Sequence, residues 1–351
     1  MEIVEYLEEA VAKCASDLFI VAGGNVSIKL DGRLQAIRQE RLLPPKTKSL
    51  VSEIYKLADR DIEPYLQNGD DDFAFAIPGL ARFRVNAYRQ RGSLAAVIRV
   101  VSFEIPDWQQ LNIPEKLMEL ANTGHGMILM TGTAGSGKST TQACLIDRIN
   151  RTRDCHIVTL EDPIEFLHRN QRSIVSQREI AVDTADYLSA LRSCLRQAPD
   201  VILLGEMRDA ETIQTAISAA ETGHLIIATM HTKGAVNAID RIIDSFPSSH
   251  QAQIRMMLSM VLRTVVSQQM MPDKNGEMVP AFEIMHVNSA IRSMIRDNKN
   301  HQIGNAIAAG GKEGMVTMDH AILELYRKGI ISKETALDYA DSPELIQRQM
   351  N

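Results

Sequence analysis

The stretch that decides the fold is G-M-I-L-M-T-G-T-A-G-S-G-K-S-T-T, residues 126–141. Within it, G-T-A-G-S-G-K-S at 132–139 has the phosphate-loop spacing of a glycine, four residues and then Gly-Lys-Ser/Thr. The apolar run 127–130 predicts a strand before the loop, and residues 139–149 predict a helix after it. Since this motif requires that context, the sequence predicts a nucleotide-binding loop rather than a glycine-rich turn with a stray lysine.

Each part of the loop has a task in binding a nucleoside triphosphate. Glycines let the backbone turn its N–H groups inward around phosphate oxygens, and the N-terminus of the next helix favours negative charge. Lys138 is expected to reach the β- and γ-phosphates, and the Ser139 hydroxyl is suited to Mg²⁺. The loop positions expected around the phosphates are Gly132, Thr133, Ala134, Gly135, Ser136 and Gly137.

The composition excludes several classes of protein. The chain has 351 residues, enough for two domains, and its 45% hydrophobic and 23% charged residues are ordinary for a globular protein. A net charge of −6 gives no support for a nucleic-acid surface. No apolar run approaches the ~20 residues of a membrane helix, and the acidic N-terminus is unlike a signal peptide. We therefore expect a cytoplasmic protein that docks on a membrane partner without inserting.

Two domains joined by a linker are predicted. Residues 1–103 carry two helical patterns and several short strands, including hairpins around Asp31-Gly32 and Pro78-Gly79, which predicts a small α+β domain. Residues 104–114 have two prolines and little periodicity, and we interpret them as the linker. Residues 115–351 form the second domain.

The second domain begins as alternating strands and helices. Its short apolar strands are predicted at 127–130, 156–160, 201–204 and 225–229. Runs of this kind are typical of parallel strands that are buried on both faces. The pattern predicts a doubly wound α/β sheet that binds its ligand at the carboxyl ends of the strands.

Helices are expected between these strands and beyond them. Thr184 and Asp209 are predicted to cap two of the intervening helices. From about residue 247 the pattern becomes helical, starting with a long amphipathic helix that continues to Val265. Shorter helices are predicted at 290–296, 305–309, 319–328 and 333–339.

Two acidic clusters follow predicted core strands, where the fold brings them toward the γ-phosphate. Hydrolysis needs a carboxylate that orients and deprotonates water. Glu206, in V-I-L-L-G-E-M-R-D, is our first choice for this base. Glu161, in T-L-E-D-P-I-E-F, is the second choice, and either carboxylate is a candidate Mg²⁺ ligand through water. The alternative for both is a solvated acidic loop.

Histidines flank the strand in H-L-I-I-A-T-M-H, and arginines mark the first domain. His231 follows this strand and is expected to sense the γ-phosphate, while His224 precedes it. Arg82, Arg84 and Arg99 lie on predicted strands of the first domain. Arginines that project from a sheet are suited to act as fingers on a neighbouring subunit's nucleotide, and exposed surface charges are the equal alternative.

Taken together, these stretches resemble the secretion-type ATPases of the hexameric RecA-like class. G-T-A-G-S-G-K-S-T resembles their Walker A box, T-L-E-D-P-I-E-F the Asp box, and D-V-I-L-L-G-E-M-R-D the Walker B box. T-G-H-L-I-I-A-T-M-H-T resembles the His box. The four boxes occur in the family's order, and the resemblance extends to A-S-D-L-F-I and A-R-F-R-V-N-A near the start of the chain.

The resemblance implies a PAS-like N-terminal domain before a RecA-like domain, with ATP and Mg²⁺ bound between subunits of a homohexamer. By position, Thr140 joins the phosphate ligands, and His224 and His231 form the His-box pair. Glu206 and Glu161 would serve catalysis. The inter-subunit arginines would be among Arg82, Arg84 and Arg99.

Within the family, the chain resembles the branch that retracts type IV pili. The assembly and secretion branches carry a tetra-cysteine zinc insert and a longer N-terminal region, and neither is present here. The A-I-R-S-M-I-R-D stretch at 290–297 is similar to A-I-R-N-L-I-R-E of the retraction branch. The implied partner is the inner-membrane platform protein of the pilus machine, at the inner face of the cytoplasmic membrane.

Other functions predict different behaviour. An assembly or secretion ATPase of a type II secretion or competence system shares the boxes. A nucleotide-gated binding module would keep the phosphate loop without needing Glu206. A RecA-like nucleic-acid translocase is disfavoured by the acidic balance and by the lack of interleaved aromatic and basic residues.

Overall fold

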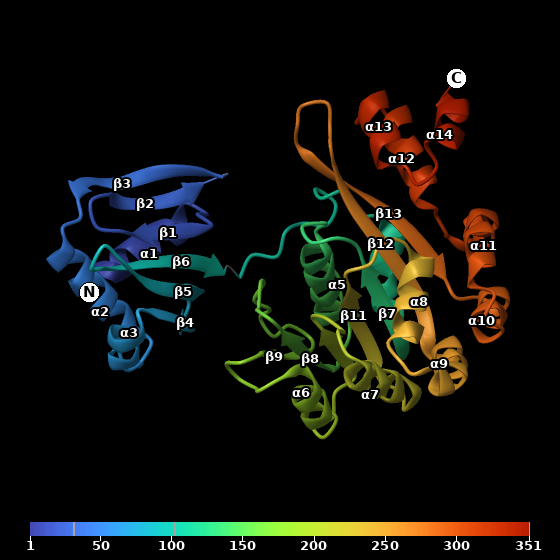
Figure 1. The fold of residues 1–351 in the computed structure, drawn as a ribbon, viewed down its shortest axis with the longest axis horizontal. Helices are drawn as coiled ribbons and strands as arrows, with labels where there is room; N and C mark the ends of the chain where they lie inside the picture. The colour runs from blue at the N-terminus through green and yellow to red at the C-terminus, as the bar shows by residue number, and fades with distance from the viewer. Residues whose placement is uncertain (31, 102, 351) are drawn as a thin grey trace. The chain divides into compact units, whose positions relative to one another are not determined.

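The computed structural model describes residues 1–30, 32–101 and 103–350 (Figure 1). These residues form two compact units. The first unit is Met1–Glu104 with Glu165–Leu167, and the second is Ile105–Ile164 with the chain from His168 onward. Each unit is described by itself below.

The first unit is a six-stranded antiparallel sheet with helices on one face. The strand order is β3-β2-β1-β6-β5-β4. The strands are β1 (Asp17–Ile20), β2 (Asn25–Leu30), β3 (Arg33–Arg41), β4 (Asp70–Ile77), β5 (Ala81–Gln90) and β6 (Ser93–Val101). The helices are α1 (Glu2–Ala12), α2 (Pro44–Leu57) and α3 (Glu63–Asn68). This is the predicted α+β arrangement.

Alternation along the strands separates the two faces of this sheet. On β5, Phe83 and Val85 are buried in one core with Leu7 of α1 and Ile54 of α2. The intervening Arg84 is only half-buried, because it lies on the opposite face. The predicted hairpin at Pro78-Gly79 pairs β4 with β5; in the other hairpin, Asp31 lies outside the described residues.

The second unit is built on a seven-stranded sheet of order β13-β12-β7-β11-β10-β8-β9. The first five strands along the chain are β7 (Gly126–Thr131), β8 (His156–Glu161), β9 (Ile174–Glu179), β10 (Val201–Leu204) and β11 (Leu225–Met230). They are followed by β12 (Leu262–Pro272) and β13 (Met278–His286). All neighbours are parallel except β12 and β13, which confirms the predicted parallel α/β fold.

Helices cover both faces of this sheet. Met127 and Leu129 of β7 contribute to one core, and Ile128 and Met130 contribute to the other. The first core is closed by α6 (Tyr187–Cys194), α7 (Ala210–Glu221), α8 (Ala235–Asp244), α9 (Ser248–Val261) and α10 (Ser289–Arg296). The second is closed by α4 (Glu115–Met118), η1 (Glu119–Asn122) and α5 (Lys138–Thr152). The sheet is therefore doubly wound, as predicted.

The stretch interpreted as a linker packs onto the second unit. Ile105, Trp108 and Leu111 lie against the core that contains α5, and Ile113 is buried in it. The Cys144 thiol of α5 also donates a hydrogen bond to a carbonyl in this stretch. Apolar residues without periodicity form this packing, so residues 105–114 belong to the second unit.

The prediction that the long helix continues to Val265 is wrong. Helix α9 ends at Val261, and β12 begins at the next residue. The apolar positions of this segment fit a helical period, but β12 is a strand because it pairs with β7 on one side and β13 on the other. The edge strand β9 also escaped prediction, since most of its side chains are only half-buried.

The rest of the C-terminal region is helical, as expected. It comprises η2 (Asn300–Gln302), α11 (Ile303–Ala309), η3 (Gly310–Glu313), α12 (Met318–Arg327), α13 (Lys333–Tyr339) and α14 (Pro343–Met350). Helices α12 to α14 lie beside the β12–β13 hairpin and share a small core with Met271 and Ala281 (Figure 1). Among the described residues, no helix combines the length and apolar character needed to span a membrane.

One of the two predicted helix caps is correct. Asp209 accepts a hydrogen bond from the Thr212 N–H at 2.8 Å at the start of α7. Thr184 does not cap α6; the cap is Asp186, which accepts from the Ser189 N–H at 2.7 Å. A carboxylate at the right offset is at least as good a cap as a threonine hydroxyl, so the helix starts later than predicted.

Candidate functional site

The predicted site residues follow strands that end at one edge of the parallel sheet. Thr131 of β7 pairs with Met230 of β11, and Leu204 of β10 pairs with Leu160 of β8. The phosphate loop, His231, Gly205-Glu206 and Glu161 begin directly beyond these four residues. Because parallel strands end together, the structure brings these segments to the same edge, where α/β folds bind their ligands.

The backbone of the phosphate loop depends on glycine. Gly132 has a φ of 144° and Gly137 a φ of 83°, and Gly137 immediately precedes the first residue of α5. A Cβ on Gly132 would lie 2.3 Å from the Gln268 carbonyl oxygen and 2.6 Å from the Ser136 Oγ. Both the turn and its close packing therefore require an absent side chain.

Polar groups inside the loop are arranged for a ligand with many acceptor atoms. The Lys138 side chain is buried, and its Nζ donates to the Gly132 and Thr133 carbonyls at 2.9 and 2.8 Å. The buried hydroxyls of Thr131 and Ser136 have no hydrogen-bond partner among the described residues. Since buried polar groups are normally paired, these hydroxyls and the ammonium group fit a phosphate chain.

Gln268 of β12 was not predicted as a site residue, and it packs against the phosphate loop. Its Oε1 accepts a hydrogen bond from Thr141 Oγ1 at 2.9 Å, and its side chain is buried. A Cβ on Gly137 would lie 2.9 Å from the Gln268 Nε2. No sequence pattern predicts this residue, because its place beside the loop depends on the pairing of β12 with β7.

Gly132→Ala is expected to damage the loop more than Gly135→Ala does. Both glycines have positive φ, at 144° and 77°, but a Cβ on Gly135 would meet no atom within 4 Å. The clash with the Gln268 carbonyl should cost about 1–3 kcal/mol of unfolding free energy beyond the control. Urea unfolding of the two variants measures this difference, and equal stabilities would contradict the close packing.

Glu206 is held at the sheet edge by two basic side chains. Its side chain is 18% exposed, and its Oε2 lies 2.7 Å from both Nε and Nη2 of Arg208. The His231 Nε2 lies 3.7 Å from the same oxygen. Glu206 and His231 were each predicted near the γ-phosphate, and the structure brings them close together through the neighbouring strands β10 and β11.

The backbone next to Glu206 is closely packed. A Cβ on Gly205 would lie 2.8 Å from the Tyr187 hydroxyl oxygen and 3.2 Å from the Leu160 carbonyl oxygen. The Gly205 carbonyl accepts a hydrogen bond from the Thr229 hydroxyl, and the Met207 N–H donates to the Thr229 carbonyl at 3.1 Å. Glu206 is therefore presented from a rigid strand end, which suits a residue that must orient a reactant.

Glu161 lies at the end of β8 in a more polar setting. Its Oε1 accepts from Thr159 Oγ1 at 2.6 Å and from Gln177 Nε2 at 3.2 Å. A polar setting of this kind suits a carboxylate that orients water or a hydrated cation. Gln177 comes from β9, the strand that escaped prediction.

The two histidines of H-L-I-I-A-T-M-H do not lie together. They lie on either side of β11, and that six-residue strand holds them at its opposite ends, roughly 20 Å apart. The His224 Nδ1 lies 2.9 Å from the Ala219 carbonyl oxygen at the end of α7. Within one chain, His224 is therefore far from the phosphate loop that it was expected to serve.

The three candidate arginines share one face of the first unit's sheet. Arg84 lies directly opposite Arg99 in the antiparallel pairing of β5 with β6, and Arg82 is two residues from Arg84 on β5. The Arg99 Nε lies 3.1 Å from Asp17 Oδ1. Arg84 forms no ion pair among the described residues, so its cation is compensated least.

The acidic residues alone do not form a metal site. Among the described residues, no group of three or more His, Cys, Asp or Glu side chains is placed to hold a metal ion. Mg²⁺ in nucleotide sites, however, takes most of its ligands from water and phosphate oxygens. The half-buried Ser139 in the first turn of α5 fits this mode, with the substrate completing the site.

A cavity of about 260 Å³ adjoins the phosphate loop within the second unit. Gly137, Thr140 and Thr141 line it on one side, and residues 110–113 and 277–280 line it on others. The cavity combines amide and hydroxyl groups with apolar contacts such as Met270 and Pro280. Mixed walls of this kind beside a phosphate loop suit the nucleoside part of a nucleotide.

Comparisons with known proteins match this chain over most of its length. The family model described as "Type II/IV secretion system protein" matches residues 2–282. The type IV pilus retraction ATPase PilT of Pseudomonas aeruginosa is 42% identical over 345 residues, covering 98% of this chain and 99% of the relative. A type II secretion system protein E of Dickeya dadantii is 36% identical but covers 68% of this chain and 49% of that protein.

A solved structure agrees over the same length. The crystal structure of the pilus retraction motor PilT with bound ADP matches with a TM-score of 0.89 and 41% identity. The match covers 99% of this chain and 99% of that chain. The similarity therefore includes both units and the whole candidate site.

Proposed function

The chain belongs to the type II/IV secretion system protein family and is an ATPase of the pilus-retraction type, and we propose that it withdraws type IV pili. The observation that carries this proposal is a similarity to PilT that extends from end to end of both chains. The type II secretion relative matches over only 49% of its own length, which disfavours a secretion role. Retraction of this kind produces twitching motility.

The reaction is hydrolysis of ATP in the presence of Mg²⁺. Lys138 and the inward N–H groups of the loop bind the phosphates, and Ser139 contributes a ligand to Mg²⁺, which neutralises charge on the phosphate oxygens when it is bound. The cavity beside the loop receives the base and the ribose. Glu206 orients and deprotonates the attacking water, because it is the carboxylate held at the end of a rigid central strand.

The neighbouring groups support this role of Glu206. Arg208 and His231 hold its side chain on one side. Glu161 serves as a second carboxylate that orients water or the hydrated Mg²⁺, and Thr159 and Gln177 fix the position of its Oε1. His231 follows the strand next to β7, so it is positioned to respond to the γ-phosphate.

The working assembly is a homohexamer with its nucleotide sites at the subunit interfaces. Arg84, whose cation has no ion-pair partner among the described residues, completes the site of the adjacent subunit with Arg99 or Arg82. Hydrolysis changes the arrangement of the two units of each chain. This movement turns the platform protein at the inner face of the cytoplasmic membrane.

Deletion of the gene in its native host tests the direction of pilus movement. Cells without the protein should carry excess surface fibres that do not retract, as seen by imaging of labelled pili. Wild-type protein should restore retraction, whereas the Glu206→Gln variant should not. Loss of fibres in the deletion strain would instead assign the chain to pilus assembly, and unchanged fibres with loss of secretion would assign it to a secretion system.

A further inference from the structure

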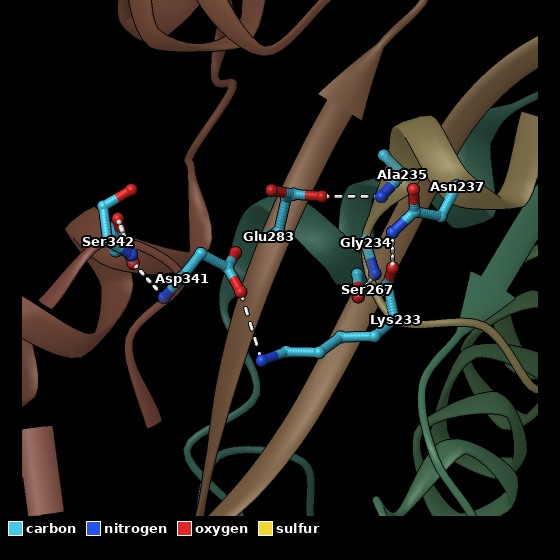
Figure 2. A network of polar contacts seen from close by, with 9 residues as sticks. Lys233, Gly234, Ala235, Asn237, Ser267, Glu283, Asp341 and Ser342 are labelled. Carbon is cyan, nitrogen blue, oxygen red and sulfur yellow. Dashed lines mark hydrogen bonds and ion pairs between the residues drawn. The ribbon is translucent and has the colours of Figure 1, made fainter. Parts of the chain in front are cut away.

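A polar network joins the segment after His231 to the C-terminal helices (Figure 2). At its centre is Glu283 of β13, whose side chain points toward the start of α8 and is almost fully buried. Its Oε1 accepts a hydrogen bond from the Ala235 N–H at 2.7 Å. Ala235 is the first residue of α8, so the carboxylate lies at the positive end of this helix.

The same carboxylate also serves a second helix. Burial raises the pKa of Glu283 above its ordinary value, and the nearby Asp341 and Asp319 carboxylates raise it further. Hydrogen bonding from the backbone of Ala235 and from that of Met318, the first residue of α12, opposes this rise. Glu283 therefore connects the N-termini of two helices that come from distant parts of the chain.

An ion pair forms a second connection between the same regions. The Lys233 Nζ lies 3.1 Å from the Asp341 Oδ1, and both side chains are 46% exposed. Asp319 of α12 accepts hydrogen bonds from the N–H groups of Asp341 at 2.7 Å and Ser342 at 3.1 Å. The backbone that carries Asp341, between α13 and α14, is thus held by α12.

Both connections end close to the nucleotide site. Lys233 is two residues after His231. The Gly234 N–H donates to Ser267 Oγ at 3.0 Å, and Ser267 of β12 pairs with Thr131, the last residue before the phosphate loop. Gln268, which supports the loop, is the next residue of β12. A displacement of residues 232–234 would therefore disturb contacts to the phosphate loop and to the C-terminal helices.

A purely stabilising role does not account for the Lys233–Asp341 pair. Ion pairs that are half exposed contribute only about 0–1 kcal/mol to stability. Asp341, the partner of Lys233, also lies near Glu283, because its charge raises the pKa of that buried carboxyl together with burial and Asp319. The pair therefore links the segment after His231 to the C-terminal helices by electrostatics as well as by contact.

We propose that Glu283 and the Lys233–Asp341 pair are positioning residues that hold the segment after His231 against the C-terminal helices. In this arrangement a nucleotide-dependent movement at His231 is transmitted to α12–α14, and those helices in turn set the geometry for hydrolysis. None of the three residues touches the reacting atoms. The proposal rests on the hydrolysis of ATP proposed above, and it adds a route by which the C-terminal helices affect it.

The decisive variant is Asp341→Asn, with Asp338→Asn as the matched control. Asp338 is an exposed aspartate of α13 that forms no ion pair among the described residues. Asp341→Asn is expected to lower kcat by about 2- to 30-fold, the range of known coupling effects, with KM and Tm little changed. Asp338→Asn should leave all three unchanged. Equal kcat values in the two variants would overturn the proposal.

A charge exchange checks that the pair itself is responsible. The double variant Lys233→Asp with Asp341→Lys should recover most of the kcat that either single change removes, because it restores the ion pair with opposite polarity. Glu283→Gln should lower kcat as well. Its amide oxygen can accept from the N–H of one helix N-terminus, but its NH₂ group would face the N–H of the other helix, and two donors cannot bond to each other. A double variant no better than the singles would contradict the proposal.

Hydrogen exchange provides a readout that does not depend on turnover. Binding of a non-hydrolysable ATP analogue with Mg²⁺ should change the exchange protection of the backbone from 339 to 343 in the wild-type chain and not in Asp341→Asn. A wild-type chain that binds the analogue without any change in this segment would overturn the coupling, even if its hydrolysis were normal. A chain that shows the change but hydrolyses no ATP would contradict the proposed function alone.

Discussion

Glu206→Gln is expected to abolish ATP turnover while leaving ATP binding intact. Loss of a general base lowers a rate by about 10²- to 10⁴-fold, and the amide preserves the size and shape of the side chain. The residue follows β10 on a backbone that is closely packed at Gly205, so the substitution should not displace it. Phosphate release under saturating ATP and Mg²⁺ measures the rate, and calorimetry measures the affinity.

The control for this change is Glu221→Gln, an exposed glutamate at the end of α7. It should hydrolyse ATP at the wild-type rate. The stability of Glu206→Gln should also stay near that of the wild type, because the ion pair it weakens involves an Arg208 side chain that is 64% exposed. A Glu206→Gln enzyme with normal turnover would assign the base to another residue, and a wild-type chain that binds ATP without turnover would reveal a binding module.

Much of the site was predictable because its parts are local in sequence. The phosphate loop is recognised by spacing alone, since each glycine, the lysine and the serine have fixed tasks along one turn. Glu206, Glu161 and His231 follow short apolar strands, and the ends of parallel strands must lie at one edge. Local pattern and global fold agree at these positions, so a single sequence was sufficient.

The contributions of β12 were not predictable, because they depend on pairing between distant segments. Gln268 supports the phosphate loop only because β12 lies next to β7, and the pattern of residues 262–266 gives no sign of this pairing. Glu283 is likewise an ordinary glutamate in the sequence. Its burial follows from the packing of α8 and α12 around β13, and the sequence pattern does not predict this packing.

The placement of His224 could have been predicted better. His224 and His231 are separated by the six residues of β11, and residues that bracket a strand must lie at its opposite ends. The family resemblance named both histidines as one pair, and the strand pattern already separated them. The length of β11 keeps His224 away from the phosphate loop of its own chain. His224 could therefore contact only the nucleotide of another subunit.

The arginines on one face of the first unit's sheet, Arg82, Arg84 and Arg99, favour binding of an external anion. Arg84 and Arg99 are directly opposite each other on neighbouring strands, and like charges in such pairs destabilise a sheet. Asp17 compensates Arg99 at 3.1 Å, but no described acid pairs with Arg84. A site that retains this unfavourable charge is suited to bind phosphate oxygens supplied by a partner.

Arg84→Ala is therefore expected to reduce the turnover of assembled rings by about 10³- to 10⁵-fold, the effect of removing an arginine finger. Arg91→Ala, which removes an exposed arginine at the turn between β5 and β6, is the control and should retain normal activity. Ring assembly, followed by light scattering, should be unchanged in both variants. Normal hydrolysis by an assembled Arg84→Ala ring would remove Arg84 from the site.

Mixing two inactive variants decides whether Arg84 acts on its own chain or on a neighbour. Arg84→Ala chains keep Glu206, and Glu206→Gln chains keep Arg84, so a mixed ring contains some interfaces with both groups intact. If the site is shared between subunits, the mixture should regain a measurable part of the wild-type rate that neither variant has alone. If Arg84 and Glu206 act within one chain, every site lacks one of the two groups and the mixture must stay inactive.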